Sequence, residues 1–421
     1  MNTASQRRVL LGVALATVAG LTLAGCGASP SGGDEKTELR ILVGTSATLS
    51  LDDWEARVAP YLEEHPNVSI KFETPVGDEQ AHVTLARQLA AGDAPDMVGG
   101  QTFIQEEPMM ETIPDGDWVS ETPLYDQIQT DGRQWYVAAG VLAHSLVFYN
   151  EDAFEEAGVD GIPQTVDELT EAAEKLKAAG YIPFAVAGSW VTAGQFQKMA
   201  GPIIAEEDPD WYTARNAGEV TWTDSAYGEY VEVYHDWIDA GYMRSDAMGL
   251  EYDDAIADFT SGQAAMIVEA NRVVKPIDAA EPAFTVGVFA SPGFTDAPMP
   301  LMATGINEYA VLKTSEHKEV AFDLLKYLAS DPVPVTLALQ QVGAFRPGFT
   351  YEMSPLNEKV AEIANASDLV VAGVGDGTGN RTAPPGMTVF LNTQLQSMWD
   401  GASAADVNRQ VDEWWTANAA Q

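Results

Sequence analysis

Strand-like and helix-like segments alternate along the first hundred residues, and this alternation restricts the possible folds more than any other feature. Leu39–Gly44, Val68–Thr74 and Asp96–Gly99 are short apolar or alternating runs that are typical of strands. Between them, residues 54–62 and 81–89 carry apolar side chains at the spacing of a helix. This β-α-β-α-β order predicts a mostly parallel sheet that is covered by helices.

The same alternation resumes further along the chain. Two expected helices are preceded by capping pairs, Ser50 with Asp53 and Thr165 with Glu168, in which each side chain bonds a backbone N–H of the first turn. The later elements are expected as strands at 183–188, 264–268 and 284–289, and as helices at 230–238, 315–330 (begun by Ser315) and 389–415.

The amino terminus has the features of a secretory signal. Arg7 and Arg8 precede the uncharged apolar run Val9–Ala24, which is slightly short for a permanent membrane span. The run ends in Leu23-Ala24-Gly25-Cys26, which resembles the bacterial lipobox, and Cys26 is the only cysteine of the chain. We therefore expect residues 1–25 to be a signal peptide, Cys26 to be lipidated, and residues 26–36 to tether the fold to the outer face of the membrane.

Length and charge limit the class of protein further. A chain of 421 residues exceeds what one core supports, which predicts two domains. The 63 acidic residues against 22 basic ones give a net charge of −41, and such a surface repels nucleic acid and anionic lipid. No acidic loop has calcium spacing, and no zinc, P-loop or dinucleotide motif occurs, so the sequence predicts no metal and no cofactor.

Six segments resemble, in the same order, those of the family 1 extracellular solute-binding proteins, the maltose-binding-like receptors of bacterial ABC importers. The first has the "AAG-x-x-PD-hydrophobic" pattern and the second the "LYYNKDLF" pattern of that family. In this chain the segments are Ala90–Met97, Ser145–Phe154, Glu155–Leu169, Phe259–Met266, Val286–Gly293, and Gly305–Asn307 followed by Glu319–Leu328.

The resemblance implies an α/β fold of the periplasmic-binding-protein type. Each of its two lobes is expected to be a mostly parallel sheet flanked by helices, and crossing hinge strands join the lobes. Residues 37–143 and 304–344 then form lobe one, and residues 144–303 and 345–421 form lobe two. The implied function is reversible capture of a small carbohydrate between the lobes, followed by delivery to the permease of an ABC transporter, by a monomer that is not an enzyme.

Candidate ligand contacts are polar or aromatic residues that follow expected strands or lie at the expected crossings, because strand ends point loops into the crevice of such folds. Amide, carboxylate and guanidinium groups suit sugar hydroxyls. The candidates are Thr45, Ser46, Gln101, His144, Trp190, Gln195, Glu269, Asn271, Arg272, Asn307, Arg346 and Arg381.

Several of these residues have a second interpretation. Trp190 either stacks on a ligand or packs within the protein. Arg272 stands where many relatives carry a sugar-stacking aromatic, and it either contacts ligand or pairs with Glu269 or with surface acids. His144 either contacts ligand or packs at the hinge. The replacement of an aromatic by Arg272 favours a short ligand of one or two sugar units.

The strongest alternative from another class is a secreted, lipid-anchored hydrolase that processes carbohydrate with two carboxylates. With 63 acidic residues, a carboxylate pair is always available, so composition does not favour it. No Gly-x-Ser-x-Gly elbow occurs, and the five histidines lie without zinc spacing.

Overall fold

The computed structural model describes residues 36–45, 49–75, 81–100, 109–306, 308–371 and 382–419. Its first sheet has the strand order β10-β3-β1-β2, and its strands are β1 (Thr37–Val43), β2 (Val68–Glu73), β3 (Met97–Gly99) and β10 (Tyr309–Val311). β1 pairs in parallel with β2 and β3, whereas β10 pairs with β3 in the antiparallel direction. The mostly parallel sheet expected from the alternation of the first hundred residues is confirmed.

The helices between these strands begin and end as their sequences predict. In α1 (Leu51–Glu64), the Ser50 hydroxyl accepts a hydrogen bond from the Asp53 N–H at 3.3 Å, and the Asp53 carboxylate accepts one from the Ser50 N–H at 2.7 Å. α2 (Ala81–Ala91) is followed by Gly92, whose φ of +68° suits glycine. The apolar face of α1 buries Trp54, as expected.

The second sheet has the order β6-β7-β5-β8, and its strands are β5 (Leu146–Asn150), β6 (Ile182–Ala185), β7 (Ala264–Glu269) and β8 (Val286–Ala290). Only β6 and β7 pair in parallel, and β5 pairs with β7 and β8 in the antiparallel direction. The expectation of a mostly parallel sheet therefore does not hold here. The reason is that β5, in the interior of this sheet, runs opposite to β6, β7 and β8.

Helices cover both faces of the second sheet. Alternate residues of a strand point to opposite faces, so Val147 and Met266 lie in one core while Phe148 and Ile267 lie in another. The remaining α-helices of the described residues are α3 (Asp117–Ser120), α4 (Glu151–Ala157), α5 (Val166–Ala178), α6 (Val191–Glu207), α7 (Trp211–Asn216), α8 (Ala226–Asp239), α9 (Tyr252–Thr260), α10 (Val274–Ala280), α11 (Lys318–Ser330), α12 (Pro332–Val342), α13 (Pro355–Ala366), α14 (Met387–Gln396) and α15 (Ala404–Asn418).

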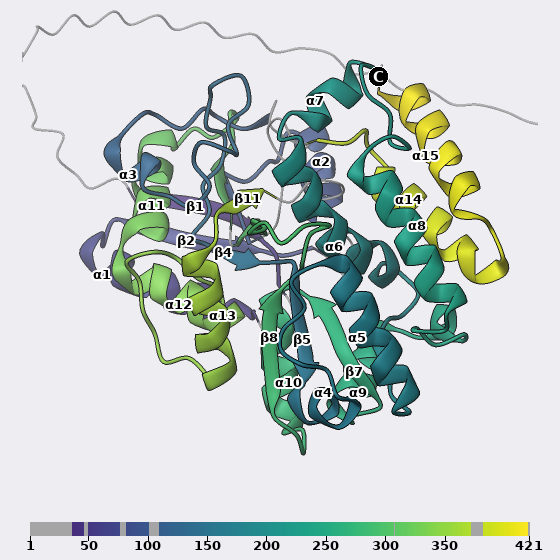
Figure 1. Cartoon of the computed structure of the whole chain (residues 1–421). Helices are drawn as coiled ribbons and strands as arrows, with labels where there is room; N and C mark the ends of the chain where they lie inside the picture. Colours follow the sequence, from purple (N-terminus) through teal and green to yellow (C-terminus); the bar gives the residue numbers. More distant parts are fainter. Residues whose placement is uncertain are drawn as a thin grey trace, which may run out of the picture. The chain divides into compact units, whose positions relative to one another are not determined.

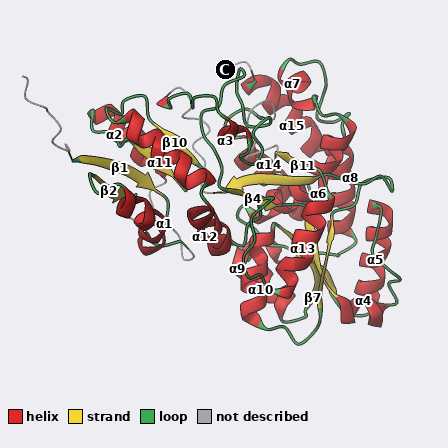
Figure 2. Ribbon diagram, turned by 90° about the vertical axis from the view of Figure 1, so that its left-hand side faces the viewer, coloured by secondary structure: helices red, strands yellow, loops and turns green. Residues whose placement is uncertain are grey.

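A third sheet of order β11-β9-β4 joins the other two, with β4 (Gly140–Ala143), β9 (Leu301–Ile306) and β11 (Leu369–Val371). β4 pairs with β9 in the antiparallel direction, with Ala143 opposite Ala303. In Figure 2, β4 and β11 lie between β1 and β2 on one side and β7 on the other. The paired alanines are the residues at which the sequence placed the first two crossings.

One expected helix start differs from the structure. Ser315 does not cap α11, which begins at Lys318 after His317. Instead the Ser315 hydroxyl donates a hydrogen bond to Asp96 at 2.6 Å and accepts one from the His317 N–H at 3.1 Å. The contact with Asp96 ties Ser315 to the start of β3, and this tertiary partner competes with the local cap.

Packed aromatic rings hold the carboxyl-terminal helices to the rest of the fold. α15 lies beside α8 (Figure 1), and Trp222 stacks on Tyr227 with ring centroids 4.5 Å apart. The Trp222 indole N–H donates a hydrogen bond to Asn408 of α15 at 3.0 Å. Trp237 of α8 is also buried. Among the described residues, the model contains no helix with the length and apolar character needed to cross a bilayer.

We expect Trp222→Ala to lower the free energy of unfolding by about 3–5 kcal/mol, because it opens a cavity in a packed core and removes the partner of Asn408. Urea unfolding followed by circular dichroism measures this change. Val389→Ala is the control, since Val389 is 74% exposed and its truncation is expected to change stability by less than about 0.5 kcal/mol. Equal stability of the two variants would contradict the packing described here.

Candidate functional site

Five side chains from four separate segments meet near the end of β7, and we call them the Trp190 cluster: Trp190, Lys198, Tyr252, Glu269 and Arg272. Glu269 is the last residue of β7, and its side chain is 3% exposed. Its Oε1 lies 3.2 Å from Lys198 Nζ and 3.3 Å from Arg272 Nη2, and it accepts a hydrogen bond from the Ala270 N–H at 2.7 Å. One buried carboxylate therefore holds two cations.

The two cations set the protonation of their neighbours. Burial by itself raises the pKa of Glu269, but Lys198 and Arg272, helped by the Ala270 N–H, hold that pKa at about 2. His144 lies at the connection between β4 and β5, and burial together with Lys198 and Arg272 lowers its pKa to about 3. Its Nε2 lies 2.8 Å from the Thr304 hydroxyl. The carboxylate is thus ionised and the imidazole neutral at neutral pH.

Trp190 supplies the aromatic surface of the cluster. It is 42% exposed, its ring centroid lies 4.9 Å from that of Tyr252, and the Arg272 guanidinium carbon lies 5.1 Å from the ring centroid. Lys198 Nζ lies 5.8 Å from the same ring. The pairing of Arg272 with Glu269, which the sequence left as one of two interpretations, is present, and the Arg272 side chain is still 42% exposed.

The backbone before Trp190 is fixed by distant segments. Gly188 has no room for a side chain, because a Cβ there would lie 2.6 Å from the Met248 carbonyl oxygen. Ser189 has a φ of +53°, and its carbonyl oxygen accepts hydrogen bonds from Asn392 and, at 2.8 Å, from Gln396 of α14. The side-chain amide oxygen of Asn392 also accepts a hydrogen bond from the Ala193 N–H at 3.0 Å. α14 thereby positions the indole of Trp190.

Three other predicted contacts are bonded to main-chain groups. Gln195 donates to the Ala185 carbonyl at 3.0 Å, and Asn271 accepts from the Ala143 N–H at 3.0 Å and donates to the Gly343 carbonyl at 2.5 Å. Arg346 is buried and donates to the carbonyls of Ala139, Ala329 and Glu121. In this structure these side chains are buried and fasten the segments around β4, β6 and α12.

The remaining predictions concern the other side of the expected site. Thr45 is exposed just after β1. Ser46, Gln101, Asn307 and Arg381, together with the lipidation residue Cys26, lie outside the described residues. Their roles stay predictions, and the described part of the site belongs to the segments around the second sheet.

Comparisons with known proteins agree with this architecture. A family model described as bacterial extracellular solute-binding protein matches residues 47–333, which is more than half of the chain. The chain belongs to this family.

Two curated relatives of this solute-binding protein are similar at low identity. The multiple sugar-binding protein of Streptococcus mutans is 23% identical over 288 residues, which are 65% of this chain and 67% of that protein. An uncharacterised ABC transporter extracellular-binding protein of Pyrococcus horikoshii is 25% identical over 253 residues, which are 56% of each protein. The alignments therefore span about two thirds and about half of these relatives.

A solved structure supports the fold. The solute-binding protein RafE in complex with raffinose superposes with a TM-score of 0.70 at 17% identity, and the match covers 91% of this chain and all of that one. The two-lobe architecture predicted from the sequence is confirmed. At this level of identity the match concerns the fold alone.

Sequence reasoning missed two members of the Trp190 cluster, Lys198 and Tyr252. Lys198 was detectable, because it is the single charged residue in the otherwise uncharged first fourteen residues of α6. A lysine within such a run is a candidate for a buried functional cation. Tyr252 carries no comparable signal, since it begins α9 between acidic residues.

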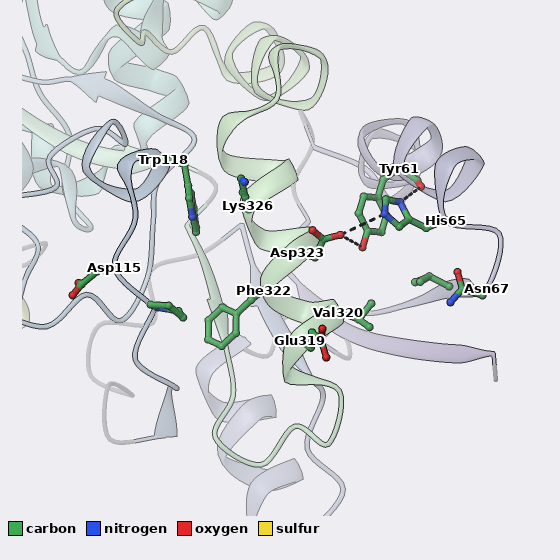
Figure 3. Close-up of a pocket in the computed structure, with 12 residues that line it drawn as sticks. Tyr61, His65, Asn67, Asp115, Trp118, Glu319, Val320, Phe322, Asp323 and Lys326 are labelled. Atoms are coloured by element: carbon green, nitrogen blue, oxygen red, sulfur yellow. Dashed lines mark hydrogen bonds and ion pairs between the residues drawn. The ribbon is translucent and has the colours of Figure 1, made fainter. Parts of the chain in front are cut away.

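Away from the Trp190 cluster, a hollow of about 450 Å³ lies at the amino-terminal end of β2, beside α11 (Figure 3). The Tyr61 hydroxyl donates to Asp323 at 2.9 Å, and His65 stacks on Tyr61 with ring centroids 4.0 Å apart. Trp118 and Phe322 lie on the other side of α11. Because Asn67 and Val68 at the start of β2 line this hollow, it is separate from the carboxyl strand ends where ligands of such folds bind. Among the described residues, no three His, Cys, Asp or Glu side chains converge in a metal-binding group.

We expect His144→Gln to flatten the dependence of stability on pH. A folded-state pKa of about 3, against 6.5 for an unperturbed imidazole, means that the stabilisation by neutral His144 is complete above about pH 6.5 and is lost as the pH falls toward 3. Between pH 4.5 and 6.5 the wild type then loses up to about 1.4 kcal/mol per pH unit more than the variant. Urea unfolding across this range measures the difference, and His317→Gln, at an exposed histidine, is expected to retain the wild-type slope.

Proposed function

We propose that the chain is the substrate-binding protein of an ABC importer and that it captures a small carbohydrate reversibly between its lobes. The Trp190 cluster carries the proposal, because it combines a partly exposed indole with charged hydrogen-bonding groups at a strand end. An aromatic surface suits the C–H face of a sugar, and charged side chains suit its hydroxyls. The sugar-binding names of relatives in the same family support this ligand class.

The hydrolase alternative has less support. The family consists of binding proteins, and the buried carboxylate of the cluster, Glu269, is engaged by two cations rather than paired with a second carboxylate. A glycosidase needs two carboxyl groups on either side of the scissile bond. We therefore propose that the ligand leaves this protein unchanged and passes to a membrane permease.

We propose that residues 37–143 and 304–344 form lobe one and that residues 144–303 and 345–421 form lobe two. His144 and Ser145 connect β4 to β5, residues 291–300 connect β8 to β9, and Gly343 to Phe345 follow α12 beside β4. Rotation about these connections is the motion that would close the lobes on a ligand.

The test of this function is a panel of mono- and disaccharides, measured by titration calorimetry and analysed for products. We expect saturable binding of at least one sugar, unchanged ligand, and at a ligand concentration of about 100 times Kd a stabilisation of about 2.7 kcal/mol. Trp190→Ala should weaken binding by about a factor of ten, whereas Trp414→Ala, at a half-buried tryptophan of α15, should not. Release of a new product, or the absence of binding to every sugar, would contradict the proposal.

We also propose that Cys26 carries the lipid that anchors the protein outside the cytoplasmic membrane, as the lipobox-like sequence Leu23–Cys26 predicts. Cys26→Ser should move the protein from the membrane fraction to the soluble fraction, because one thioether-linked lipid group is then absent. Ser31→Ala in the same segment is the control and should leave it membrane-bound. Intact-mass measurement of the native protein without acyl chains on Cys26 would contradict the anchor.

A further inference from the structure

We propose that the Trp190 cluster selects a saccharide that carries one carboxylate, of the hexuronate class, over its neutral counterpart. The inference rests on the proposed function and specifies its ligand. It follows from the charges that the fold places around Trp190 rather than from the presence of an aromatic surface alone.

The cluster is positive within a strongly acidic protein. Only 22 of the 421 residues are Lys or Arg, and the net charge is −41. Two of these cations, Lys198 and Arg272, nevertheless meet at the single carboxylate of Glu269, so the three charged groups sum to one positive charge. The Lys198 side chain is only 7% exposed, and its pairing with Glu269 offsets part of the cost of burying its charge.

Two of the three acids on α9 are engaged elsewhere. Asp254 accepts a hydrogen bond from the Glu251 N–H at 2.9 Å at the start of the helix, and Asp258 pairs with Arg244 at 3.2 Å. Both cations of the cluster lower the pKa of His144, and only Glu269 opposes them, which agrees with a net positive charge of these three groups. The cluster itself thus has a charge of the sign opposite to that of the protein as a whole.

A single surplus charge matches a ligand with a single negative charge. The Arg272 side chain is 42% exposed beside the partly exposed Trp190, so a sugar ring against the indole would bring a substituent carboxylate within reach of the guanidinium. Arg binds carboxylate oxygens through paired N–H donors, and such charge-assisted bonds are the strong ones. A phosphate, with close to two negative charges, would be matched less well.

The experiment uses matched pairs of ligands: glucose with glucuronate, galactose with galacturonate, and mannose with mannuronate, each titrated calorimetrically into the purified protein. We expect one uronate to bind at least tenfold more tightly than its neutral partner. Raising the salt concentration should weaken uronate binding and leave neutral-sugar binding unchanged. Glucose 6-phosphate tests whether the cluster prefers a ligand with one negative charge to a ligand with close to two. Tighter binding of this phosphate than of any uronate would overturn the inference.

Substitutions of Arg272 test whether this residue causes the preference for the uronate. Arg272→Gln should lower the preference for the uronate by about ten- to a hundredfold, because it removes a charge-assisted hydrogen bond, and Arg272→Lys should restore part of it. Arg409→Gln is the matched control, since Arg409 is an exposed cation of α15 that pairs with Asp406 and Glu413. If Arg272→Gln fails to fold, the salt dependence of the wild type decides.

The outcomes separate the inference from the function. Equal affinity for the neutral sugar and its uronate, with saturable binding of both, overturns the inference and leaves the carbohydrate-binding function in place. Failure to bind any sugar, neutral or acidic, overturns both. A uronate preference that is insensitive to salt and unchanged in Arg272→Gln also overturns the assignment to this cluster.

Discussion

The antiparallel pairing of β4 with β9 is the interaction on which the arrangement of the two lobes depends. At Ala143 and Ala303, two segments far apart in the sequence lie side by side. Asn271, just after β7, accepts from the Ala143 N–H and donates to the Gly343 carbonyl, so one side chain fastens β4 and the end of α12. The polar side chains around this pairing are buried and bonded to main-chain groups.

The same strand end carries the chemistry. Glu269 precedes Asn271 by two residues, and its carboxylate gathers Lys198 from α6 and Arg272 from the turn after β7. A buried ion pair adds little net stability, because desolvation offsets most of the attraction. The recognition role proposed above would account for this ion pair in a protein with few cations. The last residue of β7, Glu269, belongs to the cluster, and Asn271, two residues later, binds the Ala143 N–H.

Much of the fold was predictable from the sequence because it depends on local signals. The capping pair at Ser50 and Asp53 and the alternation of strands and helices predicted the first sheet correctly. Trp190, Glu269 and Arg272 were predicted because each follows a strand. Ser315 was wrong as a helix cap, since Asp96, more than two hundred residues away, binds its hydroxyl. Lys198 and Tyr252 were missed because each lies within or at the start of a helix, and only packing brings them to Glu269.

The sequence by itself determined the family, the order of the elements and the expectation of an exported chain, because motif order, apolar periodicity and the amino-terminal signal are all written locally. The tertiary structure decided which polar residues gather at the Trp190 cluster and which fasten the backbone. Gln195, Asn271 and Arg346 have the same chemical character as the residues of the Trp190 cluster, but each donates a hydrogen bond to a main-chain carbonyl. Periodicity cannot distinguish these two uses, because a hydrogen bond to a remote carbonyl depends on where the chain returns in space.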